Sequence, residues 1–120
     1  MNAADFLSLS SEILRCAELD DAGRILSYAE SSKGKEANLP CNFQVTVRAL
    51  NIQGLSESLP KELGDVRYTM VLSDKYRLLT LSISGRLFMF ALPLETDPDP
   101  ICNTALRRFG PKKVNRSRHI

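Results

Sequence analysis

The sequence has few of the residue types from which common catalytic and metal-binding sites are built. Among its 120 residues there is one histidine, His119, and it lies next to the last residue. The three cysteines, Cys16, Cys41 and Cys102, are odd in number and form no C-x-x-C pair, so neither a disulfide framework nor a zinc site is expected. A nucleophilic triad needs a base, usually histidine. We therefore predict no catalytic residues, no metal and no cofactor.

Nucleotide-binding motifs are also absent. The six glycines form neither a G-x-x-x-x-G-K-[ST] loop nor a G-x-G-x-x-G fingerprint, the two glycine-rich patterns that hold phosphates. The sequence thus predicts a protein that is not an enzyme. An enzyme whose site is assembled from scattered residues stays as an alternative.

Long hydrophobic runs are missing as well. No stretch approaches the ~20 apolar residues that a membrane-spanning helix needs, and the N-terminus lacks the basic start and apolar block of a signal peptide. At 120 residues the length suits one domain. We predict an intracellular, cytoplasmic protein with reduced cysteines, with nuclear import as an alternative location.

Acidic residues are absent from the last fourteen positions, and this divides the charge of the chain. Residues 1–106 carry ten Lys/Arg and fourteen Asp/Glu, a net −4, whereas residues 107–120 carry six Lys/Arg and no acid, a net +6. A basic cluster of this kind can neutralise phosphates and release counterions. It predicts nucleic-acid binding, to RNA or DNA, by Arg107, Arg108, Lys112, Lys113, Arg116 and Arg118.

Other uses of this tail stay open. It could be a solubilising tail, a nuclear-import sequence around Pro111-Lys112-Lys113, or a contact for an anionic membrane or a protein partner. Because residues 111–120 have too little apolar content to pack, we predict that they are disordered.

The densest apolar pattern lies between residues 65 and 92. Apolar side chains alternate there over 65–72, 77–83 and 87–92, a period of two that is typical of strands. Two turn-forming segments, Ser73–Tyr76 and Ser84-Gly85, separate them. Links this short require antiparallel pairing.

The last of these strands is apolar on both faces. Leu87, Met89 and Ala91 alternate with phenylalanines and a leucine, so both faces of the sheet need a cover. Helices can cover one. We predict that Leu87, Met89 and Ala91 form an interface with a partner, in the first instance a second copy of the chain.

The first half of the chain contains a helical pattern. Apolar residues recur at three- and four-residue spacing over 2–32, which predicts two helices with a bend near Asp20, or one long helix. Residues 31–40 are polar and predict a loop, and 43–50 alternate as a first strand.

Three shorter segments complete the chain. Residues 58–63 predict a short helix with Pro60 in its first turn and Gly64 as its stop. Residues 95–100 predict an extended connector, and 101–109 predict a short helix.

Together these elements predict an α+β fold in which two N-terminal helices pack on a four-stranded, mainly antiparallel sheet (43–50, 65–72, 77–83, 87–92). One domain would span 1–110 and the basic tail 111–120. The predicted function is a small binding protein, oligomeric through its sheet, that contacts nucleic acid with its tail. The alternative is a protein–protein adaptor, or a viral or phage accessory or structural protein, whose apolar sheet face binds a partner.

Overall fold

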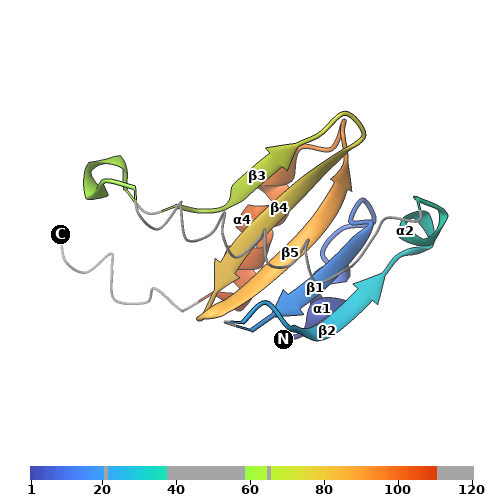
Figure 1. Cartoon of the computed structure of the whole chain (residues 1–120), viewed down its shortest axis with the longest axis horizontal. Coiled ribbons are helices and arrows are strands. Elements are labelled where there is room, and N and C mark those ends of the chain that lie inside the picture. Colours follow the sequence, from blue (N-terminus) through green and yellow to red (C-terminus); the bar gives the residue numbers. More distant parts are fainter. Residues whose placement is uncertain (21, 38–58, 65, 111–120) are drawn as a thin grey trace.

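The computed structural model describes residues 1–20, 22–37, 59–64 and 66–110. They form an α+β fold around one five-stranded antiparallel sheet with strand order β2-β1-β5-β4-β3 (Figure 1). In chain order the elements are α1 (Ala3–Leu7), β1 (Arg15–Leu19), β2 (Ile25–Glu30), α2 (Ser32–Ala37), the 3-10 turn η1 (Lys61–Leu63), β3 (Thr69–Leu72), β4 (Tyr76–Ile83), β5 (Arg86–Pro93) and α4 (Pro98–Phe109).

The predicted antiparallel meander is confirmed as β3, β4 and β5, but the first strand was predicted over 65–72 and begins only at Thr69, with residues 66–68 outside it. Ser84 and Gly85 connect β4 to β5 with φ angles of 51° and 76°, and two positive φ angles give the two-residue hairpin turn whose twist matches that of the strands. The Ser73 hydroxyl donates to the Tyr76 carbonyl oxygen at 2.8 Å and accepts from the Tyr76 N–H at 3.1 Å, which closes the other turn. Both connections thus follow from local turn chemistry.

The prediction of two N-terminal helices is wrong beyond residue 7. Residues 15–30 form the antiparallel hairpin β1–β2 instead. Its turn depends on Asp20, near which the sequence predicts a bend between helices: the Asp20 Oδ1 accepts the backbone N–H groups of Ala22 and Arg24 at 2.9 Å each. Gly23 supplies the positive φ, 84°, that the turn requires.

Burial on both faces of β1 explains why the sequence pattern of this strand predicted a helix. Cys16 and Glu18 lie on one face, Ala17 and Leu19 on the other, and all four are buried. A strand that is covered on both sides shows an apolar run without alternation, which periodicity does not separate from a helix. A register shift between Glu18 and Leu19 disturbs the period of two further.

The first turn of the predicted helix does exist. The Asn2 side chain accepts the Asp5 N–H at 3.0 Å while the Asp5 carboxylate accepts the Asn2 N–H at 3.0 Å. This reciprocal pair satisfies two backbone donors at the start of α1. The short helix thus presents Phe6 to the sheet.

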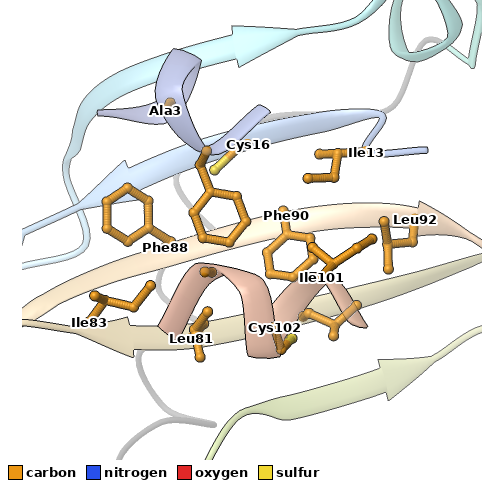
Figure 2. Close-up of a cluster of buried hydrophobic side chains, with 13 residues drawn as sticks. Ala3, Ile13, Cys16, Leu81, Ile83, Phe88, Phe90, Leu92, Ile101 and Cys102 are labelled. Carbon is orange, nitrogen blue, oxygen red and sulfur yellow. The ribbon is translucent and has the colours of Figure 1, made fainter. Parts of the chain in front are cut away.

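The main core lies between one face of the sheet and the helices α1 and α4 (Figure 2). The Phe6 ring is stacked on Phe88 with centroids 5.3 Å apart, and lies 4.8 Å from Phe90. The fully buried side chains that share this core include Ile13, Cys16, Leu79, Leu81, Ile83, Leu92 and Cys102.

Helix α4 is longer than predicted and includes part of the expected connector. It begins at Pro98, because the Asp97 side chain caps it by accepting the Asp99 N–H at 3.0 Å and proline suits the first helical position. The predicted short helix at 58–63 is confirmed as the single turn η1, with Pro60 before it and Gly64 after it.

The predicted loop at 31–40 is wrong for residues 32–37, which form α2. Gly34 lies so close to Leu14 that a Cβ atom would be 1.9 Å from the Leu14 carbonyl oxygen, so this approach requires glycine. The predicted strand at 43–50 and the predicted disordered tail at 111–120 lie outside the described residues.

Candidate interaction surface

The structure places the predicted interface residues on the sheet face opposite α1 and α4. Leu87 and Ala91 are buried within the chain, at 8% and 1% exposed, and Met89 is half-buried. Leu87 and Met89 pack against Leu19 and Ala17, their partners on β1, and Ala91 is paired with Arg15. A partner at these three residues stays a prediction, and they offer little accessible surface in the single chain.

Larger apolar exposure lies at an edge of the sheet. Among the residues that the structure describes, strand β3 is last in the strand order and pairs with β4. Three consecutive apolar residues of β3 are exposed: Met70 at 41%, Val71 at 40% and Leu72 at 61%. We call these three residues the β3 edge. No charged residue or proline occurs within the four residues of β3, so it lacks two of the features by which natural edge strands resist pairing.

Contacts on the sheet and on α4 hold this edge in place. Tyr68, just before β3, donates its hydroxyl hydrogen bond to the Asp99 carboxylate on α4. That bond, followed by burial, raises the pKa of Tyr68 to about 12. Within the sheet, Met70 is paired with Leu79 and Leu72 with Arg77, whose Nε donates to the Leu94 carbonyl oxygen at 2.7 Å. The strand is thus positioned before any partner binds.

At the opposite end of the strand order lies β2, which within the described part of the chain pairs with β1. Ile25, Leu26 and Tyr28 are exposed there, Leu26 at 58%. The Tyr28 hydroxyl donates to the Glu30 carboxylate at 3.0 Å and accepts from Arg15 Nη1 at 3.4 Å. In Figure 1 the two edges lie on opposite sides of the sheet.

An ion pair between β5 and β1, together with the hydrogen bonds around it, joins the sheet to α1. Arg86 Nε lies 2.8 Å from Glu18 Oε2, whose side chain is 3% exposed. The Ser27 hydroxyl donates to the other Glu18 oxygen at 3.1 Å and accepts the Ala3 N–H at 2.9 Å. Arg86 also donates to the Met1 carbonyl oxygen at 2.7 Å. Among the described residues Glu18 is the one buried charged side chain, and these contacts give it a structural role.

The two cysteines that the structure describes are free and buried, as predicted. Burial raises the pKa of the Cys16 thiol, with a further contribution from Glu18. Burial followed by Asp99 raises the pKa of Cys102 to about 12. Both thiols are therefore protonated at neutral pH and unsuited to nucleophilic chemistry. Cys41 lies outside the described residues.

Of the predicted nucleic-acid-binding residues, the structure describes two. Arg107 and Arg108 are exposed in the last turn of α4; Lys112, Lys113, Arg116 and Arg118 lie outside the described residues. Within the described ranges no group of three or more His, Cys, Asp or Glu side chains could hold a metal ion. No helix in the same part of the chain is long and apolar enough to cross a membrane.

No family model and no curated protein matches the sequence. Solved structures do match. A Roadblock/LC7 domain from Streptomyces avermitilis matches with a TM-score of 0.61 and 15% identity over 88% of this chain and 91% of that one. The chain has a Roadblock/LC7-like fold.

Two other similar structures have the same arrangement. An MglB with a tetrameric arrangement gives a TM-score of 0.60 at 15% identity, covering 88% of this chain and 77% of that one. MglC from Myxococcus xanthus gives 0.58 at 15% identity, covering 88% and 87%. At such low identity the likeness to the Roadblock/LC7-like fold establishes architecture alone. It gives no support to the predicted nucleic-acid binding or to a viral accessory role.

Sequence reasoning missed the β3 edge as a site, although it placed the strand. Alternation in 65–72 predicts one buried and one exposed face, yet Met70 and Leu72 share a face with Val71 opposite, and all three are exposed. Only the order of the strands shows that β3 is last in the sheet. The sequence clue that could have found it is the absence of charge across Thr69–Leu72.

Proposed function

We propose that this chain is a self-associating protein-interaction module in which the β3 edge pairs with the β3 edge of a second copy. The observation that carries the proposal is the row of exposed apolar side chains, Met70, Val71 and Leu72, on a strand that is last in the sheet formed by the described residues. Pairing would satisfy the backbone groups of the edge and remove the apolar side chains from water.

Symmetry favours a second copy as the first partner. When a strand pairs with itself around a two-fold axis the two copies run antiparallel and form one closed interface. The sheet is already antiparallel at this edge, so the pairing would continue its geometry. A similar structure, an MglB, has a tetrameric arrangement, which supports self-association as a use of this fold.

The proposed function is non-enzymatic. In the described residues the one buried carboxylate is already paired with Arg86, and both described thiols are protonated at neutral pH. The exposed apolar β3 edge suits binding rather than chemistry.

Substitution of one residue at the centre of the β3 edge tests the proposal. Val71→Lys would place two lysines at the proposed interface, because each copy contributes one. We expect the dimer to weaken by at least about tenfold, which corresponds to ~1.4 kcal/mol. The measurement is molecular mass by sedimentation equilibrium over a dilution series.

Leu63→Lys is the matched control, because Leu63 is also exposed, at 70%, but belongs to η1 rather than to a strand. It should leave the mass unchanged. A wild-type chain that stays monomeric at high concentration, or a dimer that Val71→Lys leaves intact, contradicts the proposal.

The basic tail carries a separate hypothesis, nucleic-acid binding, that rests on the charge division alone. Removal of residues 111–120 tests it. If the tail binds phosphates, affinity for an RNA or DNA duplex should fall steeply with salt in the full chain and be lost in the shortened one. Equal affinities for the two chains would leave the tail with a solubilising role.

A further inference from the structure

We infer that β3 pairs with a second copy in one register, in which Val71 lies opposite Val71 and Met70 lies opposite Leu72. The inference rests on the proposed self-association and adds which residues of the two copies meet across the two-fold axis. It begins from the backbone, because a strand accepts a neighbour only through N–H and C=O groups that point toward that neighbour. The direction of these groups in β3 therefore limits the registers that are possible.

One hydrogen bond at the end of β3 shows which backbone groups point outward. The Ser73 N–H donates to the Tyr76 carbonyl oxygen at 3.0 Å, across the turn toward β4. Backbone groups alternate between the two sides of a strand, and the pairing of β3 with β4 is continuous. The groups of Val71 therefore also point to β4. The N–H and C=O groups of Met70 and Leu72 point to the outer side of β3, away from β4.

The outward groups decide between registers centred on Met70, Val71 or Leu72. With Val71 at the centre, each Met70 lies opposite a Leu72, and such a pair exchanges both of its hydrogen bonds. With Met70 at the centre, Leu72 would have to pair with Tyr68, which precedes the strand. With Leu72 at the centre, Met70 would have to pair with Asp74, which belongs to the turn. Only the register centred on Val71 satisfies every outward group of β3 within the strand.

The same register places apolar side chains opposite one another on both faces of the sheet. Met70 is paired with Leu79 of the main core, so Met70 and Leu72 lie on the α4 face and Val71 on the other. The two Val71 residues form a pair without hydrogen bonds, the kind in which side chains lie closest. Cross-strand pairs of this kind stabilise a sheet. The closed contact follows from the two-fold symmetry.

Charge limits the length of the pairing. Beyond β3 the same register would bring Arg67 of each copy toward Lys75 of the other. Like charges at opposed positions are destabilising, so the pairing ends with the strand. Tyr68, which lies between Arg67 and β3, is held by its hydrogen bond to Asp99 on α4. The contact is therefore short and depends on each residue of the β3 edge.

Single cysteine substitutions in a Cys41→Ser background read the register directly, because the remaining Cys16 and Cys102 are buried. Val71→Cys should form a cross-linked dimer under mild oxidation, since opposed Cα atoms about 4.5 Å apart suit a disulfide. In Met70→Cys and in Leu72→Cys the two cysteines would be diagonal neighbours about 7–8 Å apart. Each should cross-link at least about tenfold more slowly than Val71→Cys.

Two further cysteine variants make the measurement specific. The double variant Met70→Cys/Leu72→Cys should cross-link, because its cysteines lie directly opposite each other at about 5.5 Å. Leu63→Cys, on the exposed η1 turn, gives the rate of random collision. Non-reducing electrophoresis over a time course measures all of these rates.

A backbone variant tests the direction of the Met70 N–H separately. Met70→Pro removes a donor that points away from β4, a position at which an edge strand tolerates proline. Circular dichroism should therefore be unchanged, while the dimer should weaken by about tenfold or more in sedimentation equilibrium. Met70→Ala also loses the side chain but keeps the N–H, and should weaken the dimer less. Equal losses in the two variants would contradict the outward direction of this group.

The outcomes separate this inference from the proposed function. If the reduced chain is a dimer that Val71→Lys weakens, but Met70→Cys or Leu72→Cys cross-links fastest, β3 pairing stands and the register is wrong. If the chain is a dimer in which none of these cysteines reacts faster than Leu63→Cys, the interface lies elsewhere and both fail. A chain that stays monomeric refutes the proposed function, and the register with it.

Discussion

Two ion pairs of nearly equal length lie in different surroundings, and they should respond differently to the same substitution. Arg86 lies 2.8 Å from Glu18, and Arg24 lies 2.7 Å from Asp20. The Glu18 side chain is 3% exposed, whereas that of Asp20 is 20% exposed and that of Arg24 is 76% exposed. We expect burial rather than distance to decide the effect.

Arg86→Met removes the guanidinium and leaves the Glu18 carboxylate buried with the Ser27 hydroxyl as its remaining donor. Breaking a fully buried pair costs about 3–5 kcal/mol. Because the Arg86 side chain is 46% exposed, we reduce the expected loss in the free energy of unfolding to about 2–4 kcal/mol. Arg24→Met removes an exposed pair and should leave the free energy of unfolding nearly unchanged.

Urea unfolding followed by circular dichroism measures both variants, at low protein concentration so that association does not contribute. In thermal scans each kcal/mol corresponds to roughly 4 °C for a chain of this size. Glu18→Gln added to Arg86→Met removes the unpaired charge and should recover about half of the loss or more. An Arg86→Met chain as stable as Arg24→Met would refute the burial of Glu18 between the hairpin and α1.

Two further predictions concern groups whose pKa values the fold raises. In a Cys41→Ser variant the two remaining thiols, Cys16 and Cys102, should react with a thiol reagent at pH 8 only on unfolding, because burial keeps both protonated; rapid reaction of the native protein would show that the core is open. Tyr68 has a pKa raised to about 12, so the stability that it contributes as a neutral phenol is fully present below pH 10 and is lost as pH rises from 10 to 12. The phenolate absorbance that disappears in Tyr68→Phe should titrate near pH 12, and a midpoint near 10 would contradict its hydrogen bond to α4.

Much of the second half of the fold could be predicted from the sequence, because its turns and strands depend on residues that are close together in the chain. Ser84-Gly85 selects the hairpin turn, and alternation gives β4 and β5 to within one residue of their observed bounds. The helix before Gly110 was also predicted. Its start was placed three residues late because Asp97-Pro98 was taken as an extended connector rather than a helix cap.

The hairpin β1–β2 could not be predicted from the sequence in the same way. Residues 16–19 are buried on both faces of the sheet, and the burial of a strand depends on segments that are distant in sequence. Apolar residues at three- and four-residue spacing arise from such a strand as readily as from a helix. Asp20 and Gly23 are residues that favour a turn, but the helical spacing of the apolar residues around them led to the prediction of helices.

The candidate interaction surfaces also depend partly on local sequence and partly on the tertiary structure. The meander, its turns and the division of charge between body and tail follow from the sequence. The burial of Leu87 and Ala91 within the chain, and the outer positions of β2 and β3 in the described sheet, are visible only in the folded structure. Local turn and pairing preferences act over a few residues, whereas the place of a strand in a sheet depends on contacts between residues far apart in the chain. Exposure at an edge therefore appears only when the strand order is known.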